Sequence, residues 1–269
     1  MTLVTITSDW KSGDYYLGAL KGSLLSLSSD ISVVDITNSI PSFDVLQEIF
    51  ILKSTFRHFP INSIHLMGVM SEPAQGSDMV IVFGEGHYFV GVNDGRFSLL
   101  FDNMPSVCFE ISKGRGIPFS SFTSLELFKE AVDIICTNSF ETRTKICSIK
   151  RESSPGVVHN ENIITGRVLY SDSFGNVITN IEKRVFDSIH KGRDFTIFIQ
   201  GPYTKINKIS RGYNDSSPGE IIALFNSAGL LEIAVNQGNI TSLENLNPSS
   251  EIRIKFTQTE YIEKTEKTL

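Results

Sequence analysis

The pattern of apolar residues changes partway along the chain, and this change limits the folds open to it. In the first half, short β-rich runs alternate with segments in which apolar residues recur at helical spacing. After residue 162 only short β-rich runs remain, and turns separate them. The first pattern predicts an α/β domain with a central sheet flanked by helices, whereas the second predicts a small all-β barrel.

In the first half, strands and helices are expected in alternation. The expected strands are Leu3–Thr7, Ile31–Asp35, Ser63–Val69, Met79–Phe83 and His87–Val92, the last two forming a hairpin around Gly84-Glu85-Gly86. The expected helices are Gly18–Leu27, Asp44–Arg57 and Thr123–Thr137. Asp44 with Gln47, and Thr123 with Glu126, have the spacing of residues that cap the start of a helix.

A polar stretch, Lys145–Asn162, separates the two patterns. The strands expected beyond it are Ile163–Tyr170, Phe195–Gln200, Glu220–Phe225, Leu230–Val235 and Ile252–Phe256. A length of 269 residues also suits two domains. We therefore predict an α/β domain over residues 1–150, a linker over 151–162 and a β-barrel domain over 163–269.

Composition excludes several classes of partner. The 24 Lys and Arg residues are outnumbered by 30 Asp and Glu residues, so the formal net charge is −6, which argues against nucleic-acid binding. The N-terminal segment lacks the basic start and apolar run of a signal peptide, and no run of about 18 apolar residues could cross a membrane. Three cysteines without C-x-x-C spacing fit a reducing cytoplasm and no structural zinc. We expect a cytoplasmic protein with no nucleic-acid or membrane partner.

Common catalytic and cofactor motifs are absent from the sequence. Gly84-Glu85-Gly86 is not a G-x-G-x-x-G and lies between two strands, and there is no P-loop, G-x-S-x-G or H-E-x-x-H. The five histidines have no metal-ligand spacing, which favours packed or surface histidines over a metal site. The remaining candidates are polar turns that follow strands, where α/β proteins place their ligand sites.

Four polar turns have two interpretations each. They are Ser8–Tyr16, Glu72–Ser77, Asp172–Asn176 and Asn226–Gly229. In the first, Asp9 and Asp14 could accept hydrogen bonds from ribose hydroxyls or from an ammonium group. Residue types alone favour a structural interpretation: an Asx turn with a helix cap, a Pro/Gly loop and two hairpin turns. Both interpretations stand at this level.

Short motifs in a fixed order along the chain add a resemblance. They are Thr7-Ser8-Asp9, Asp14-x-Tyr16-x-Gly18, Lys21-Gly22, Val34-Asp35-Ile36-Thr37, Ile40-Pro41 with Asp44, Tyr88-Phe89-Val90-Gly91, Asn93-Asp94-Gly95, Asp172-x-Phe174-Gly175-Asn176, Thr179-Asn180-Ile181, Asn226-Ser227-x-Gly229, Leu231-Glu232-Ile233-Ala234 and Asn236-x-Gly238-Asn239. This order resembles the S-adenosylmethionine (SAM) hydroxide adenosyltransferase family, whose relatives include the fluorinase and chlorinase. The match runs nearly end to end, and the two C-terminal motifs are its most specific part.

The resemblance implies an activity and an assembly. Water or halide attacks C5′ of the ribose of SAM and expels neutral methionine, so the protein must desolvate and aim the nucleophile. No metal or separate cofactor is implied, because the sulfonium supplies the leaving group. The family assembles as trimers with each site between the N-domain of one subunit and the C-domain of a neighbour, and we expect a homotrimer here.

The resemblance also implies ligand-binding roles. Asp9 would bind the ribose hydroxyls. The methionine amino group would meet Asp14 and Asp172, and Ser227 would bind its carboxylate. The adenine would be held by a hydrogen bond from Asn176, by stacking on Tyr213 and by the backbone near Gln237.

The chain departs from the family where the water is handled. At the second turn, hydrolytic members have a segment similar to V-D-P-G-V-G-S-E-R, and later one similar to H-G-R-D. At these two places this chain has Met70–Met79 and Lys113-Gly114-Arg115-Gly116. The Asp, Arg and His of the family therefore appear as Glu72, Met79 and Lys113. We take Glu72 and Lys113 as the catalytic candidates, with the ammonium lowering the pKa of the carboxyl group. Two functions follow: a hydrolase that forms adenosine and L-methionine, or a binding protein, such as a sensor or storage module, that has lost turnover.

Overall fold

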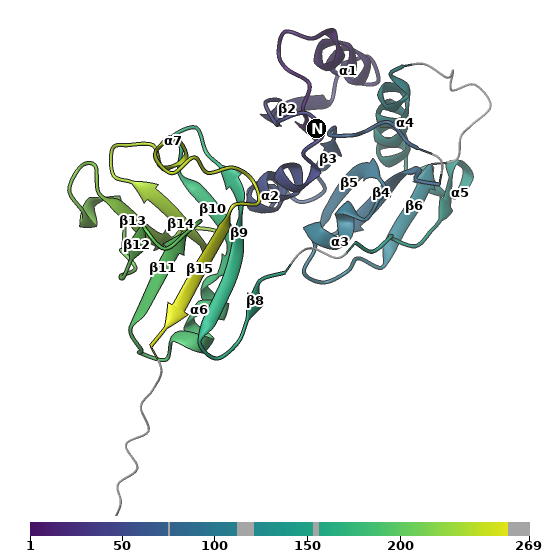
Figure 1. Cartoon of the computed structure of the whole chain (residues 1–269). Helices are drawn as coiled ribbons and strands as arrows, with labels where there is room; N and C mark the ends of the chain where they lie inside the picture. Colours follow the sequence, from purple (N-terminus) through teal and green to yellow (C-terminus); the bar gives the residue numbers. More distant parts are fainter. Residues whose placement is uncertain (75, 112–120, 153–155, 258–269) are drawn as a thin grey trace, which may run out of the picture. The chain divides into compact units, whose positions relative to one another are not determined.

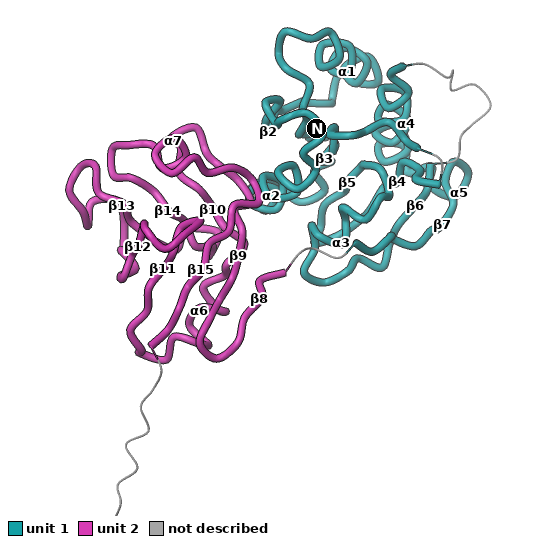
Figure 2. Tube along the Cα trace, viewed as in Figure 1, with its two compact units in different colours: residues 1–154 teal, residues 155–269 magenta. Residues whose placement is uncertain are grey.

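The computed structural model describes residues 1–74, 76–111, 121–152 and 156–257. The chain forms two compact units, residues 1–154 and 155–269, shown in separate colours in Figure 2. The division falls inside the segment predicted as a linker, but the short strand β8 (Val158–His159) in that segment pairs with the second unit's sheet.

Unit 1 is built on a seven-stranded mixed sheet in the order β2-β1-β3-β5-β4-β6-β7. Its strands are β1 (Thr2–Thr7), β2 (Ile31–Thr37), β3 (Ile64–Met67), β4 (Met79–Gly84), β5 (His87–Val92), β6 (Val107–Ile111) and β7 (Thr144–Ile146). The first four in the sheet order are parallel, and the other three join it by antiparallel pairing. The predicted β4–β5 hairpin is confirmed, and its turn places Glu85 and Gly86 at positive φ.

Helices cover both faces of this sheet (Figure 1). They are α1 (Tyr15–Leu25), α2 (Val45–Thr55), η1 (Phe56–His58), α3 (Arg96–Leu100), α4 (Thr123–Thr137) and α5 (Phe140–Arg143). Alternate strand residues supply the two apolar layers: Ile81 packs with α1 and α4, whereas Val80 and Val82 pack with α2 and α3. The predicted α/β layer architecture is confirmed.

The two predicted helix caps have different outcomes. Asp44 caps α2 as expected, since its Oδ1 accepts a hydrogen bond from Gln47 N at 2.9 Å. The Thr123–Glu126 capping pair is wrong. Thr123 is the first residue of α4, and the first N–H groups of the helix donate to Glu72, which lies 51 residues earlier in the chain. A carboxylate from another loop replaces the local cap.

Unit 2 is an all-antiparallel, nearly closed barrel in the order β12-β11-β15-β9-β10-β14-β13. Its strands are β9 (Ile163–Ser171), β10 (Val177–Glu182), β11 (Phe195–Ile199), β12 (Lys205–Ile206), β13 (Ile221–Phe225), β14 (Leu230–Val235) and β15 (Glu251–Phe256). The predicted barrel is confirmed.

Short helices interrupt the all-β pattern of unit 2. They are α6 (Lys183–His190), η2 (Tyr213–Asp215) and α7 (Ile240–Leu243), which the sequence pattern did not predict. Phe186 and Ile189 of α6 are buried and pack with the inward residues of the barrel strands. The helix therefore completes the core at one end of the barrel. Within the described parts of both units, no helix is both long and apolar enough to cross a membrane.

Candidate ligand-binding site

The parallel strands of unit 1 end at one edge of the sheet, and the first two predicted polar turns start there. Ser8 and Asp9 follow β1, and the loop that carries Glu72 follows β3, the neighbouring strand. The two strand ends lie close together because residue 68 is glycine: a Cβ there would be 2.7 Å from Ser8 Cβ. Such an edge, beside a point where the strand order reverses, is where open α/β sheets bind ligands.

The acidic residues predicted at this edge have different surroundings. Asp9 is half-buried, and its Oδ2 accepts a hydrogen bond from Phe43 N at 2.9 Å. Asp14 is exposed at the N-cap of α1, where its side chain makes no capping hydrogen bond. Asp9 thus has a fixed position with one oxygen engaged, and Asp14 is a surface carboxylate at a helix start.

A buried ionic cluster lies beneath this edge. The Arg96 guanidinium and the Glu48 carboxylate are fully buried and 3.0 Å apart, and Arg96 also pairs with Asp94 at 2.8 Å. Arg96 donates to Val69 O and Glu48 accepts from Val69 N, each at 2.9 Å. Burial raises the pKa of Glu48 to about 8, against the attraction of Arg96. The cluster holds the backbone at the end of β3, just before the Glu72 loop.

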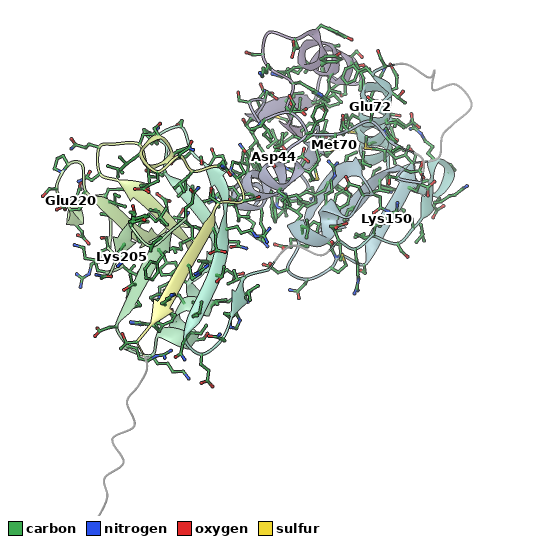
Figure 3. All side chains as sticks on the ribbon, viewed as in Figure 1. Asp44, Met70, Glu72, Lys150, Lys205 and Glu220 are labelled. Atoms are coloured by element: carbon green, nitrogen blue, oxygen red, sulfur yellow. The ribbon has the colours of Figure 1, made fainter. Side chains whose placement is uncertain are left out.

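Glu72 is engaged by the N-terminus of α4. Its Oε1 accepts from Ser124 N at 3.0 Å and from Ser124 Oγ at 2.7 Å, and its Oε2 accepts from Thr123 N at 3.1 Å. Figure 3 labels Glu72 and Met70 in this part of unit 1. The geometry gives Glu72 a structural contact, and a catalytic role for it stays a prediction. Its predicted partner Lys113 lies outside the described residues.

Met79 occupies the position at which the motif of the hydrolytic family members has an arginine. It is the first residue of β4, is 1% exposed and packs in the core between the sheet and the α1–α4 layer. This position therefore supplies no charge to the edge.

Unit 2 contains a cavity of about 610 Å³. The residues that line it are Asp172, Phe174, Asn176, Tyr213, Val235, Asn236, Gln237, Gly238 and Asn239. Asp172, Asn176, Tyr213 and Gln237 are residues that the resemblance assigns to the ligand. Asp172 and Asn176 share one turn, and the barrel brings this turn together with Tyr213 of η2 and with Gln237, which follows β14.

The Asp172 turn is internally hydrogen-bonded. Oδ1 of Asp172 accepts from Phe174 N at 3.0 Å and from Asn176 N at 2.9 Å, and Oδ2 accepts from Asn176 Nδ2 at 3.0 Å. Gly175 has φ +81°, and a Cβ there would be 2.1 Å from Cγ of Asn239. Thr241 also donates to Gly175 O from both its N–H and its hydroxyl group. Two walls of the cavity are thus in direct contact at Gly175.

Ser227 is not among the residues that line the cavity. It lies in the exposed turn before β14, whereas Gln237 follows the end of that strand. A six-residue strand separates these ends by roughly 17 Å at about 3.4 Å per residue. The role of Ser227 stays a prediction.

Sequence reasoning missed several residues at these places. Phe174 and Asn239 line the cavity, and Arg96 and Glu48 anchor the unit 1 edge. Phe174 and Asn239 belong to motifs that carried the resemblance, so their proximity to the candidate residues was a usable signal. Nothing local in the sequence marks Arg96 or Glu48 as buried. The described residues contain no group of three or more His, Cys, Asp or Glu side chains that could hold a metal ion.

Known proteins match this chain over most of its length. The N-terminal domain of the SAM hydroxide adenosyltransferase family matches residues 4–142, and its C-terminal domain matches residues 166–253. The (R)-S-adenosyl-L-methionine hydrolase of Methanocaldococcus jannaschii is 26% identical over 272 residues, which cover 95% of this chain and 97% of that protein. The protein of the same name from Salinispora arenicola is 22% identical, over 93% of this chain and 97% of its own.

Solved structures share the fold. An uncharacterized conserved protein from Thermotoga maritima has a TM-score of 0.82 at 21% identity, covering 94% of this chain and 100% of its own. A conserved hypothetical protein from Thermus thermophilus has a TM-score of 0.72 at 22% identity, covering 96% and 100%. Since both family domains match in order, one within each unit, the chain belongs to the SAM hydroxide adenosyltransferase family.

Proposed function

We propose that this protein binds SAM and hydrolyses it to adenosine and L-methionine. The observation that carries the proposal is the unit 2 cavity, where Asp172 and Asn176 of one turn meet Tyr213, which comes from a distant part of the chain. An aromatic ring beside amide and carboxylate groups suits a nucleoside. The family match and the names of the curated relatives support SAM as the ligand.

The reaction needs little covalent chemistry from the protein. The oxygen of water bonds to C5′ as the C5′–S bond breaks, and both electrons of that bond go to sulfur. Sulfur leaves as the neutral thioether of methionine, and the attacking water loses its proton to solvent. Positioning and desolvation of the water are the contributions required of the site.

The active assembly is proposed to be a homotrimer that joins unit 1 of one copy to unit 2 of another. Its support is that the predicted ligand residues are divided between the units, with Asp9 and Asp14 in one and the cavity in the other. Large apolar side chains are exposed beside both: Phe43 is 72% exposed next to Asp9, and Phe174 is 75% exposed at the cavity. Light scattering should give a mass near three times 29.9 kDa, and a single-chain mass would contradict the assembly.

A second function, ligand binding with little turnover, is favoured by the contacts of Glu72. Both of its oxygens accept hydrogen bonds from the start of α4, so directing a water toward C5′ would require it to leave that helix. Misplacement of a catalytic group can cost about a hundredfold in rate. Slow hydrolysis is the expected outcome.

Chromatography of adenosine formed from SAM distinguishes the two functions. The assay uses the (R) and (S) sulfonium epimers separately, because the curated relatives are named for the (R) form, with heat-killed protein as the blank. Slow release of adenosine that disappears in both Glu72→Gln and Lys113→Ala supports the hydrolase. Intact SAM recovered from the protein after long incubation supports the binding function. Turnover that survives both substitutions would place the chemistry elsewhere.

A further inference from the structure

We propose that Glu232 is a positioning residue that fixes the ring of Tyr213 at the cavity and joins it to the turn that carries Ser227. The proposal rests on the proposed function and adds to it a residue that does not itself touch the ligand. Through Glu232, the adenine end of the site and the predicted methionine end are held by one buried carboxylate.

The contacts of Glu232 carry this inference. One carboxylate oxygen accepts a hydrogen bond from the Tyr213 hydroxyl group, and the other accepts from Asn226 Nδ2 at 3.3 Å. Tyr213 lines the cavity, and Asn226 begins the Asn226–Gly229 turn. The same Asn226 side chain shapes that turn, because its Oδ1 accepts from Ala228 N and Leu230 N.

The location of Glu232 on β14 explains how it reaches both partners. Leu231, Ile233 and Val235 point into the barrel core, so Glu232 points to the opposite face of the sheet. There it pairs with Leu224 of β13 and shares its face with the small cluster Ile222, Leu224 and Ala234. Tyr213 comes from η2, outside the strand ladder, and its hydroxyl group meets the carboxylate on this outer face.

Burial makes the carboxylate an unusual choice for a purely structural contact. Glu232 is 4% exposed, and a carboxylate removed from water gains little net stability from its partners. An apolar residue would pack at least as well against Ile222 and Ala234. What the carboxylate adds is a fixed acceptor for the phenol of Tyr213, whose pKa is raised by burial and by Glu232, so the hydroxyl group stays a donor.

Binding measurements on the full chain test the proposal. Calorimetry with adenosine is compared for wild type, Glu232→Gln, Tyr213→Phe and the double variant. Glu161→Gln is the control, because Glu161 is exposed and precedes the start of β9, whereas the cavity residue Asp172 follows the end of that strand. We expect Glu232→Gln and Tyr213→Phe each to weaken adenosine about tenfold, which is about 1.4 kcal/mol. The double variant should be no weaker than either single one, because all three lose the same contact.

A second measurement separates positioning from folding. Titration of tyrosinate absorbance should show one tyrosine ionising at lower pH in Glu232→Gln than in wild type, while the melting temperature changes little. Variants that bind adenosine as wild type does would overturn the proposal, and so would strictly additive losses. Wild-type protein that binds neither adenosine nor SAM would instead overturn the proposed function, and the ligand role of Glu232 with it.

Discussion

The two places where this chain gathers its candidate ligand residues are built differently. In unit 2, a cavity is formed by turns that are hydrogen-bonded to themselves and to one another, as at Asp172 and Gly175. In unit 1, the candidate carboxylates lie on an open edge of the sheet, above a buried cluster of Glu48, Arg96 and Asp94. The first is a preformed pocket, and the second is a rigid base with exposed groups.

Because of this difference, we expect the two units to contribute differently to ligand affinity and to turnover. A pocket whose polar groups are already oriented loses little entropy on binding, so unit 2 should provide most of the nucleoside affinity. The unit 1 edge should contribute the ribose contact of Asp9 and whatever control of water the chain retains. Changes in the two units should therefore have separable effects on affinity, stability and turnover.

The largest expected effect is at Gly175. Gly175→Ala would drive a Cβ into the side chain of Asn239 and separate the two cavity walls, so adenosine affinity should fall at least about 100-fold, or ~2.7 kcal/mol. Calorimetry measures this. Gly192→Ala is the matched control, because Gly192 has φ +78° and open space around its Cβ position. Equal losses in both variants would mean that backbone strain alone, and not the cavity, determines the affinity.

The next effect concerns Glu72 and the stability of unit 1. Glu72→Gln replaces a charged acceptor at the start of α4, and we expect a loss of about 2 kcal/mol in the free energy of unfolding. Urea unfolding measures it, with Glu126→Gln in the same first turn as the control. A Glu72→Gln protein as stable as wild type but inactive would contradict the structural contact and favour direct catalysis.

A smaller effect is expected at Asp9. A carboxylate that accepts two ribose hydroxyls makes charge-assisted hydrogen bonds, so Asp9→Ala should weaken adenosine by at least about tenfold, or about 1.4 kcal/mol. Asp30→Ala, an exposed carboxylate in the same unit, serves as the control. Unchanged calorimetric affinity for Asp9→Ala would leave this residue as an acceptor for Phe43 N only.

The smallest expected effect is a pH dependence confined to unit 1. His65 is fully buried beside His87, and burial lowers its pKa to about 3. The unfolded chain therefore binds a proton near pH 6.5 that the folded unit excludes, so stability present above that pH is lost as the pH falls toward 3. For His65 this amounts to about 1 kcal/mol between about pH 7 and 5.5, and it is measured as the difference between wild type and His65→Phe, because the raised pKa of Glu48 changes stability in the opposite direction over the same range.

Hydrogen exchange resolves that effect by unit. Relative to His65→Phe, amides around β3 and β5 of the wild type should lose protection as the pH falls over this range, whereas the barrel strands should show no difference between the two proteins, because His65 and His87 both lie in unit 1. Equal loss of protection in both units would show that the His65–His87 pair is not responsible.

The sequence predicted most elements because their signals are local. The spans of β4, β5, β14 and α4 follow directly from apolar periodicity, and the family resemblance came from motifs of fixed spacing. The misses are long-range. The cap of α4 comes from Glu72, and Arg96, Glu48 and Glu232 are buried charges, which an interpretation by hydropathy places at the surface. Helix α6 was missed because only Phe186 and Ile189 of its short span are buried.

We expect unit 2 to hold the nucleoside and unit 1 to supply the ribose contact. A crystal structure of the protein after incubation with SAM would show whether the ligand is bound in this way. We expect adenine against Tyr213 in the unit 2 cavity, ribose hydroxyls on an Asp9 carboxylate, and either adenosine or intact SAM at full occupancy. Ligand bound elsewhere, or a cavity that stays empty at concentrations that saturate binding in solution, would contradict it.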